Sequence, residues 1–419
     1  MTETQKMKTG CFSAADILLP EGCDLQRWAV IACDQFSSQP FYWQQAESIA
    51  AGVPSAMHLI LPESELDQNP AEKFRVIHEN MLHYLHEGIF RLLPDCYVYT
   101  ERTLRNGFLR RGLIGKLDLE QYDYTGKVNA AVRATEKTVK ERIPPRMAVR
   151  RGAVLELPHV LLLCNDERRQ LIEPLGDLCS SLPKLYDFEL MLGGGHVVGW
   201  LVAGEEKQRL DAAIADYEEH ENRKHPTEKL LYAAGDGNHS LATAKACYEE
   251  QKVLEPHVGD PSSPQRYALC ELNNIHDPGQ AFEPIHRIVK HCDAEALIRA
   301  ATAALNADSG EQVRWISGKR EGILRIPADT GLPLQVLQDF LDAWLQSNAG
   351  ELDYIHGADT LSSMTDEQNT VGFCLPPILK EALFPGILSG GVLPRKTFSM
   401  GEAEDKRYYL EARRILPEV

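Results

Sequence analysis

Residues 230–246 read LLYAAGDGNHSLATAKA and combine, in this order, a short apolar stretch, a tight turn and the start of a helix. We expect a strand that ends before Gly235 and a helix that begins at His239 or Ser240. Gly235 and Gly237 permit positive φ angles and a close approach of a ligand to the main chain. The first N–H groups of such a helix, together with the positive end of its dipole, point at one place and bind anions there, phosphates above all. The turn therefore predicts an anion site.

Four polar side chains crowd into this turn: a carboxylate at Asp236, an amide at Asn238, an imidazole at His239 and a hydroxyl at Ser240. A plain helix start explains part of the pattern, because Asp236 or Ser240 would serve as N-cap. A ligand site explains all four. Both interpretations stay open on the sequence alone.

Composition limits the class of protein. The chain has 419 residues, 43% of them hydrophobic, and a formal net charge of −17, so we expect a globular protein of two or three lobes without a broad nucleic-acid surface. It has no apolar run of membrane-spanning length and no signal-peptide core at its N-terminus, which predicts a cytoplasmic protein without membrane contact. Its ten cysteines form no Cys-x-x-Cys pair, which argues against a zinc site and a disulfide framework. The oligomeric state cannot be read from the sequence.

Hydrophobic periodicity predicts an α/β or α+β protein, with mixed β-sheets flanked by helices. We expect three regions: an N-terminal α/β region at 1–149, a central lobe with the Gly-Asp-Gly turn at 150–292, and a C-terminal α/β region at 293–419. Expected strands lie at 28–33, 96–101, 108–117, 155–164, 196–202, 230–234, 267–273, 284–290, 312–316, 321–326 and 371–375. One expected helix follows Pro70, and the others lie at 128–142, 205–224, 293–306, 333–347 and from about 400.

A second anion site is expected where the last of these helices begins. Ser399 and Glu402 match a capping box, and Glu402 would pair with Lys406 one turn further on. Capping alone accounts for Ser399 and Glu402. It does not account for the basic pair Arg395 and Lys396, which adds positive charge before the helix.

Further arginines are candidates for ligand contacts. Arg133 and Glu136 lie three residues apart on an expected helix and would share a face, as an ion pair or as part of a site. Arg146 follows two prolines that would hold it rigidly toward a carboxylate or phosphate. On a strand, His286 and Arg287 would point to opposite faces, so at most one of them joins a given pocket.

Together with the turn, four other motifs resemble the bacterial family designated domain of unknown function 1015. The resemblance covers nearly the whole chain, and the motifs occur in one order. They are Arg133-Ala134-Thr135-Glu136, Arg142-Ile143-Pro144-Pro145-Arg146, Phe282-Glu283-Pro284-Ile285-His286-Arg287 and Leu393-Pro394-Arg395-Lys396-Thr397-Phe398-Ser399-Met400-Gly401-Glu402. The family name implies no activity.

A second resemblance implies an activity. Many relatives carry Asp-Gly-His-His-Arg at the turn, which looks like the phosphate-binding signature of the ParB and sulfiredoxin-like superfamily, and so implies such a fold for the central part. Members of that superfamily bind ATP, ADP or CTP, and one branch phosphorylates free serine. This chain keeps Asp236, Gly237 and His239, but it has Asn238 for the first His and Ser240 for the Arg. The change at Ser240 removes a usual phosphate clamp.

The resemblance implies a nucleotide-binding phosphotransferase that acts on a small hydroxyl metabolite such as free serine, with ATP or ADP and Mg²⁺. The alternatives are a phosphatase of a small phosphate ester such as phosphoserine, and a non-catalytic nucleotide or metabolite sensor. In the kinase hypothesis Asp236 accepts the substrate proton or binds the metal, and His239 stabilises developing charge. Phosphate contacts are assigned to Gly235, Gly237, Asn238, Ser240, Arg395, Lys396 and Ser399, and substrate contacts to Arg133, Glu136, Arg146 and Arg287. Because the turn itself brings no Lys or Arg, we expect the C-terminal part of the chain to supply the cations.

Overall fold

The computed structural model describes residues 10–37, 39–66, 71–126, 130–280, 282–327, 332–366, 368–394 and 396–416. The chain divides into two compact units: unit 1 comprises Met1–Gln280 and Gly401–Val419, and unit 2 comprises Ala281–Met400. The division into three regions at 149/150 and 292/293 stays a prediction. None of the described helices is both long and apolar enough to cross a membrane.

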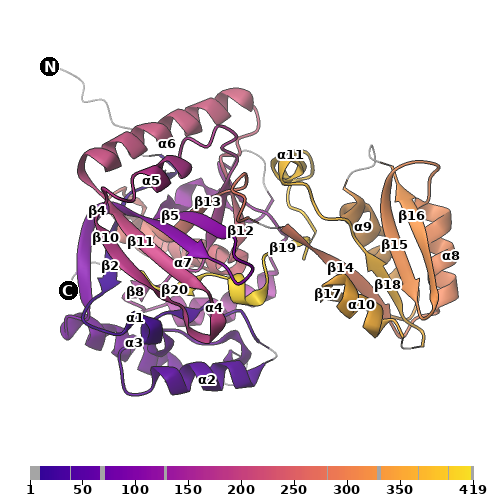
Figure 1. The fold of residues 1–419 in the computed structure, drawn as a ribbon, viewed down its shortest axis with the longest axis horizontal. Helices are drawn as coiled ribbons and strands as arrows, with labels where there is room; N and C mark the ends of the chain where they lie inside the picture. Colours follow the sequence, from indigo (N-terminus) through magenta and orange to yellow (C-terminus); the bar gives the residue numbers. More distant parts are fainter. Residues whose placement is uncertain are drawn as a thin grey trace. The chain divides into compact units, whose positions relative to one another are not determined.

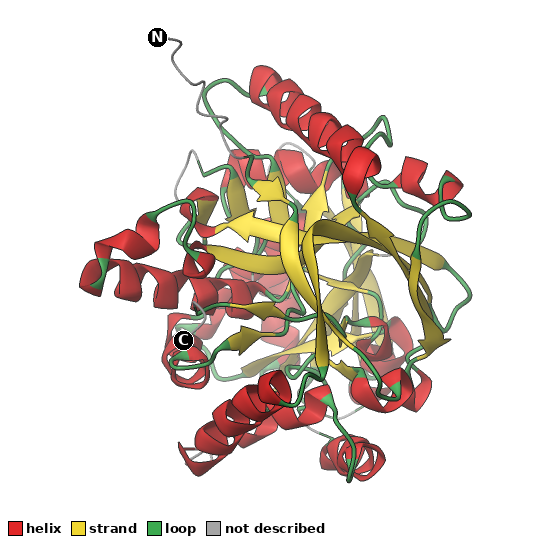
Figure 2. Ribbon diagram, turned by 90° about the vertical axis from the view of Figure 1, so that its left-hand side faces the viewer, coloured by secondary structure: helices red, strands yellow, loops and turns green. Residues whose placement is uncertain are grey.

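Unit 1 is built on a large mixed sheet whose main path runs β10-β11-β4-β5-β13-β9-β12-β7-β6, with β1 paired to β5 and β2 to β4. Figure 2 shows these strands in the interior of the unit with helices around them. The strands are β1 (Phe12–Ser13), β2 (Ala15–Pro20), β4 (Phe90–Thr103), β5 (Leu109–Asp118), β6 (Tyr122–Asp123), β7 (Val132–Ala134), β9 (Leu161–Cys164), β10 (Lys184–Glu189), β11 (His196–Val202), β12 (Tyr232–Asp236) and β13 (Tyr267–Asn274).

Short strand pairs and helices complete unit 1. Its two-stranded pairs join β20 (Tyr408–Tyr409) to β3 (Val30–Ile31), and β21 (Arg413–Arg414) to β8 (Leu155–Glu156). Its helices, labelled in Figure 1, are α1 (Leu25–Trp28), α2 (Pro40–Ala50), α3 (Ala71–His86), α4 (Ile143–Arg150), α5 (Glu173–Asp177), α6 (Gly204–Lys224) and α7 (Asn238–Leu254).

Unit 2 is a smaller α/β unit. Its sheet has the order β16-β15-β18-β14-β17, with β19 paired to β14. The strands are β14 (Phe282–Lys290), β15 (Glu311–Ser317), β16 (Arg320–Ile326), β17 (Glu351–His356), β18 (Val371–Cys374) and β19 (Phe398–Met400), and the helices are α8 (Ala294–Leu305), α9 (Pro333–Leu345), α10 (Ala358–Met364) and α11 (Lys380–Gly390).

The expected fold class, an α/β protein with mixed sheets and flanking helices, is confirmed. Two expected helices are wrong. Residues 132–134 form strand β7, which runs parallel to β12, and the two prolines after Ile143 begin helix α4 instead of ending one. Proline is well suited to the first turn of a helix, because its missing N–H would have no intrahelical partner there. The helix expected from residue 400 is also absent from the described chain, where a 3₁₀ turn (Ala403–Asp405) and strands β20 and β21 follow β19.

Strand β12 lies between β9 and β7, inside the large sheet. Its first residues are fully buried because Tyr232 and Ala234 belong to the apolar core of unit 1. The pairing with β9 shifts register between Ala234 and Asp236, an irregularity of the kind that redirects side chains at the end of a strand. The polar turn therefore follows directly on a rigid, buried strand.

Residues 401–416 return to unit 1 after unit 2 and pack against its N-terminal part. In the β3–β20 pair, Tyr409 lies opposite Val30 and Tyr408 opposite Ile31. The pairing continues past the strand, since the Ala32 amide donates to the carbonyl of Arg407 at 2.9 Å. Ala32 and Arg407, which lie far apart in the sequence, are therefore neighbours in the fold.

We predict that Gly237→Ala destabilises the protein by about 2–4 kcal/mol. The residue has φ 72°, which costs a side-chain residue roughly 1–2 kcal/mol, and an added Cβ would lie 3.0 Å from Val160 Cα and 3.2 Å from His159 Cδ2. Gly22 is the matched control, because it also has φ 72° but an added Cβ would meet open space. Urea unfolding of both variants should give a clearly smaller loss for Gly22→Ala, and equal losses would contradict the close packing at Gly237.

Candidate functional site

Helix α7 begins at Asn238, and its N-cap is Gly237 in the left-handed conformation. The first hydrogen bond of the helix joins the Leu241 amide to the Gly237 carbonyl at 3.0 Å. The N-cap is a glycine and no side-chain cap forms among the described residues, so the expected N-cap role of Asp236 or Ser240 is wrong. Gly237 is buried and Asn238, His239 and Ser240 are half-buried. A helix start without a side-chain cap leaves N–H groups for another acceptor, and an anion is a suitable one.

Asp236 ends strand β12 and faces a lysine from the C-terminal part of unit 1. The Nζ atom of Lys406 lies 3.4 Å from Asp236 Oδ2, and the two side chains are 8% and 19% exposed. Lys406 reaches this position because residues 406–409 run beside β3 and not along a helix. The expected pair of Glu402 with Lys406 is therefore wrong, and Lys406 instead brings a cation to the turn.

A histidine connects the first turn of α7 to the same C-terminal segment. His159 Nε2 lies 3.0 Å from Ser240 Oγ and 3.8 Å from Asp34 Oδ2, and its Nδ1 lies 2.7 Å from the Tyr409 hydroxyl. The His159 imidazole is buried, whereas the Asp34 carboxylate is 29% exposed. This arrangement places an ionisable imidazole between a helix start and a carboxylate.

The Asp34 carboxylate is held in its ionised form. Burial alone would raise its pKa, but His159, the Gln35 amide and Lys406 together lower the pKa below the ordinary value of 3.8. Lys406 thus acts on both Asp34 and Asp236. The neighbouring Cys33 thiol behaves in the opposite way, since burial and the Asp34 charge raise its pKa to about 12. Cys33 is accordingly protonated at neutral pH and is a poor nucleophile.

The side-chain oxygen of Asn238 has no hydrogen-bond donor in the described part of the chain. Its Nδ2 donates to Thr135 Oγ1 at 3.3 Å, while Thr135 Oγ1 donates to the Ala234 carbonyl at 2.6 Å. Among the described residues nothing donates to the buried Oδ1 of Asn238. On the other side, the Nε2 of His239 accepts from the Val139 amide at 3.4 Å. A ligand hydroxyl or amine would satisfy the Asn238 oxygen.

The other arginines expected at the site have structural partners. Arg133 is buried in β7 and donates to the carbonyls of Ala130 and Lys229, so it does not share a helix face with Glu136. Arg146 pairs with Glu63 at 2.5 Å. Arg287 lies in unit 2, fully buried, where its guanidinium donates to Gln338 at 2.8 Å. These contacts hold the three arginine side chains in place. That the arginines also contact a ligand stays a prediction.

At the second expected anion site, the expected helix start at Ser399 is wrong. Ser399 lies in β19, opposite Glu283 of β14, and caps no helix. The capping box that does form joins Glu402 to Asp405 around the 3₁₀ turn. Lys396 and Ser399 belong to unit 2, whereas the α7 turn belongs to unit 1, and Arg395 lies outside the described residues. A pocket that combines Arg395 with Asp236 therefore stays a prediction.

Four residues at the turn were missed by the sequence interpretation: Asp34, His159, Lys406 and Tyr409. One signal was available, because Asp34 directly follows the apolar strand expected at 28–33, and Asp236 follows the strand expected at 230–234 after a single glycine. The other three come from segments whose role depends on tertiary pairing. Across the described residues there is no group of three or more His, Cys, Asp and Glu side chains that could hold a metal ion.

Comparison with known proteins gives a family and several distant structures. The family described as "Protein of unknown function (DUF1015)" matches residues 19–412. No curated protein matches the chain significantly. A free serine kinase variant in complex with AMP is 11% identical, with a TM-score of 0.39, covering 72% of this chain and 91% of that one. A C-terminally truncated SbnI from Staphylococcus aureus is 10% identical, with a TM-score of 0.37, covering 68% and 81%. A conserved hypothetical protein from Pyrococcus furiosus is 13% identical, with a TM-score of 0.34, covering 70% and 90%.

We predict that Asp34→Asn lowers the free energy of unfolding by about 1–3 kcal/mol at pH 7, and that the difference from wild type shrinks as the pH falls below about 4. The folded-state pKa of Asp34 is depressed, so the stability it contributes is present above the unfolded-state pKa and is lost as the pH falls through the folded value. Urea unfolding at pH 7, 5 and 3.5 measures this. Asp216→Asn, at an exposed position on α6, is the control and should follow wild type at each pH. A gap for Asp34→Asn that stays constant with pH would contradict the ionised carboxylate.

Proposed function

The chain belongs to the family described as "Protein of unknown function (DUF1015)", and we propose that this member is a nucleotide-dependent phosphotransferase acting on a small hydroxyl metabolite such as free serine. One observation carries the proposal: the uncapped start of α7 lies beside Lys406, which acts on two carboxylates, Asp236 and Asp34. An anion site beside an ionised carboxylate is what transfer of a phosphoryl group to a hydroxyl requires.

In this proposal the start of α7 binds phosphate oxygens. Gly237 lets the main chain approach them, because no side chain stands at the N-cap. Lys406 supplies the whole positive charge that the turn lacks, and backbone N–H groups add partial charges. Charge neutralisation is the larger part of catalysis in phosphoryl transfer, where the transition state spreads negative charge over several oxygens.

Asp34 is the proposed general base. Its carboxylate is ionised, partly exposed and next to an imidazole, so it can accept the proton of a substrate hydroxyl as the oxygen attacks. His159 is a positioning residue in this scheme, since the Tyr409 hydroxyl and Ser240 hold its ring. Asn238 Oδ1 is the proposed acceptor for a second polar group of the substrate.

The residues fit a nucleotide with Mg²⁺ better than a metal bound by protein alone. Mg²⁺ usually takes one or two carboxylates and completes its coordination with phosphates and water, which agrees with the lack of a three-ligand cluster in the described chain. Asp236 is the carboxylate we assign to Mg²⁺. A bound ATP or ADP would supply the phosphoryl group, and His239 would lie at the same helix start to stabilise developing charge.

Hydrolysis of a small phosphate ester is a second candidate. The contact of 3.0 Å between Ser240 Oγ and His159 Nε2 pairs a hydroxyl with a base, as nucleophilic catalysis requires. The two activities are separable, because a kinase needs a nucleotide and a phosphatase does not. A nucleotide or metabolite sensor would bind its ligand but would neither transfer phosphate from a nucleotide nor hydrolyse a phosphate ester.

We predict that the purified protein transfers phosphate from ATP or ADP to serine or a related hydroxy compound in the presence of Mg²⁺. Asp34→Asn should reduce kcat by about 100-fold or more while the nucleotide affinity changes little, because the carboxylate acts on the acceptor hydroxyl. Lys406→Gln should instead weaken nucleotide binding. Product formation by ³¹P NMR and binding by calorimetry measure the two effects, with Asp216→Asn as the control.

The alternatives give different results in the same experiments. Phosphoserine hydrolysis without nucleotide, abolished by Ser240→Ala, would indicate the phosphatase. Tight nucleotide binding without turnover of either substrate class would indicate the sensor. Full activity of Asp34→Asn would remove Asp34 from the proposed mechanism.

A further inference from the structure

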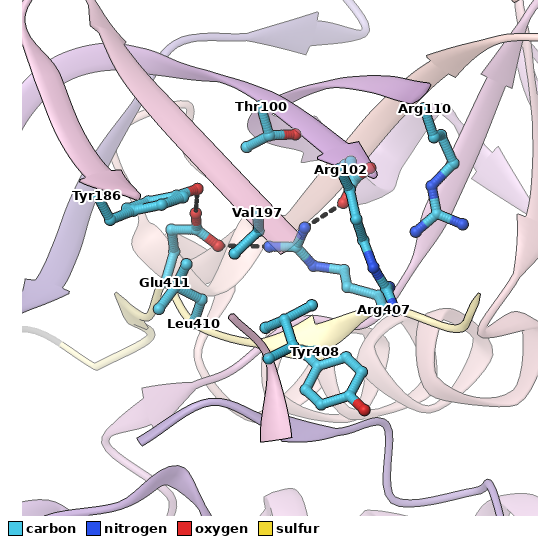
Figure 3. A pocket seen from close by; sticks show the side chains of 11 residues that line it. Thr100, Arg102, Arg110, Tyr186, Val197, Arg407, Tyr408, Leu410 and Glu411 are labelled. Carbon is cyan, nitrogen blue, oxygen red and sulfur yellow. Dashed lines mark hydrogen bonds and ion pairs between the residues drawn. The ribbon is translucent and has the colours of Figure 1, made fainter. Parts of the chain in front are cut away.

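Unit 1 contains a second site, built of buried charges. A cavity of about 30 Å³ lies between the large sheet and residues 407–411. Each lining residue is at most 8% exposed. The lining comprises Thr100, Arg102, Arg110, Tyr186, Leu190, Val197, Glu271, Arg407, Tyr408, Leu410 and Glu411 (Figure 3). Charged side chains with so little exposure are rare unless each finds compensation.

The two carboxylates of the cavity are both engaged by the same arginine. Arg407 donates to Glu271 from Nη1 and to Glu411 from Nη2, and the Tyr186 hydroxyl donates to the other oxygen of Glu411. Although burial alone would raise the pKa of Glu271, Arg407 and Arg110 hold it below the ordinary value. Glu271 is thus charged, and Arg407 divides its donors between Glu271 and Glu411.

The other two arginines form no ion pair with any described residue. Arg102 donates all five of its N–H groups to backbone carbonyls, those of Gly194, Glu404, Asp405 and Lys406. Arg110 donates from Nη1 to the Asp405 carbonyl at 2.8 Å, and its buried Nε has no partner among the described residues. Figure 3 shows the Arg110 guanidinium without a bond to the other side chains drawn.

No carboxylate of the described residues is hydrogen-bonded to Arg102 or Arg110. Asp405 is a third carboxylate close to them and its charge acts on Arg102, but its Oδ2 accepts from the Glu402 amide and its Oδ1 has no partner among the described residues. Burial, with the nearby charge of Arg110, lowers the pKa of Arg102 to about 9. The guanidiniums of Arg102 and Arg110 therefore line an empty space, and the Nε donor of Arg110 has no partner among the described residues.

We propose that this cavity binds one small monovalent anion of the size of chloride or formate, bonded by the unpartnered Nε of Arg110 and attracted by the charge of Arg102. A water molecule needs about 10–15 Å³ measured in this way, so the cavity holds a small ion or one to two waters and excludes a nucleotide phosphate chain. The anion site is consequently distinct from the start of α7. Since Arg407 adjoins Lys406, an anion here stabilises the segment that carries Lys406 to Asp236.

Thermal unfolding at constant ionic strength tests the proposal, with chloride compared against gluconate, which is too large for the cavity. Chloride should raise Tm of the wild type by about 1–3 °C through linkage. Arg110→Gln should lose this difference. Arg223→Gln, on the exposed face of α6 at 69% exposure, should keep it. Absence of a chloride effect in the wild type, or its persistence in Arg110→Gln, would overturn the proposal.

Crystals grown in bromide provide a second measurement that needs no variant and decides the matter even where Arg110→Gln fails to fold. An anomalous bromide peak within hydrogen-bond distance of Arg110 is the expected result. Density for water alone in the cavity, or bromide only at surface positions, would contradict the site. Nucleotide binding and turnover are read separately, so failure of the phosphotransferase proposal leaves this result unaffected.

Discussion

The buried guanidinium of Arg407, shared between Glu271 and Glu411, is the interaction on which the candidate site depends. An unpaired charge at this depth would cost several kcal/mol, so the segment around residue 407 has one position in which its charge is matched. That position fixes the neighbours on either side. Lys406 then lies against Asp236, and Tyr409 against His159. The C-terminal segment is therefore a structural part of the site in unit 1.

Positive charge lies at the start of α7, whereas the net charge of the whole protein is negative. The chain carries a formal charge of −17, yet Lys406 and the start of α7 bring positive charge together at one place. Asp34 and Asp236 sit beside it and are the carboxylates that Lys406 acts on. If the turn binds a small anion as proposed, the overall negative charge would repel non-specific polyanions, and the local cation would attract the small ligand.

Much of the fold could be predicted from the sequence, and the site only in part. Strands such as β11 and helices such as α6 have strong periodicity, and the structure has them where it was expected. The Gly-Asp-Gly turn was identified because strand, turn and helix are contiguous. Asp34, His159 and Lys406 were missed because only tertiary pairing brings them to the turn.

The errors have physical causes of the same kind. The segment around Arg133 has polar spacing that suits a helix, but a parallel pairing with β12 makes it strand β7. Ser399 and Glu402 match a capping box by spacing alone. The observed box uses Glu402 with Asp405, because Ser399 is engaged in a strand. Local patterns are overridden wherever a neighbouring strand offers a full set of backbone hydrogen bonds.

Residues 401–416 follow unit 2 in the chain and yet complete unit 1, which has a consequence for synthesis. A ribosome releases Asp34, His159 and Asp236 long before it releases Lys406. Until then the nascent unit 1 lacks the partner strand of β3 and leaves Glu271 without its arginine. Unit 2, whose strands all pair within residues 281–400, can fold during this interval. The order of translation thus delays assembly of the turn around Asp236 until unit 2 has been synthesised.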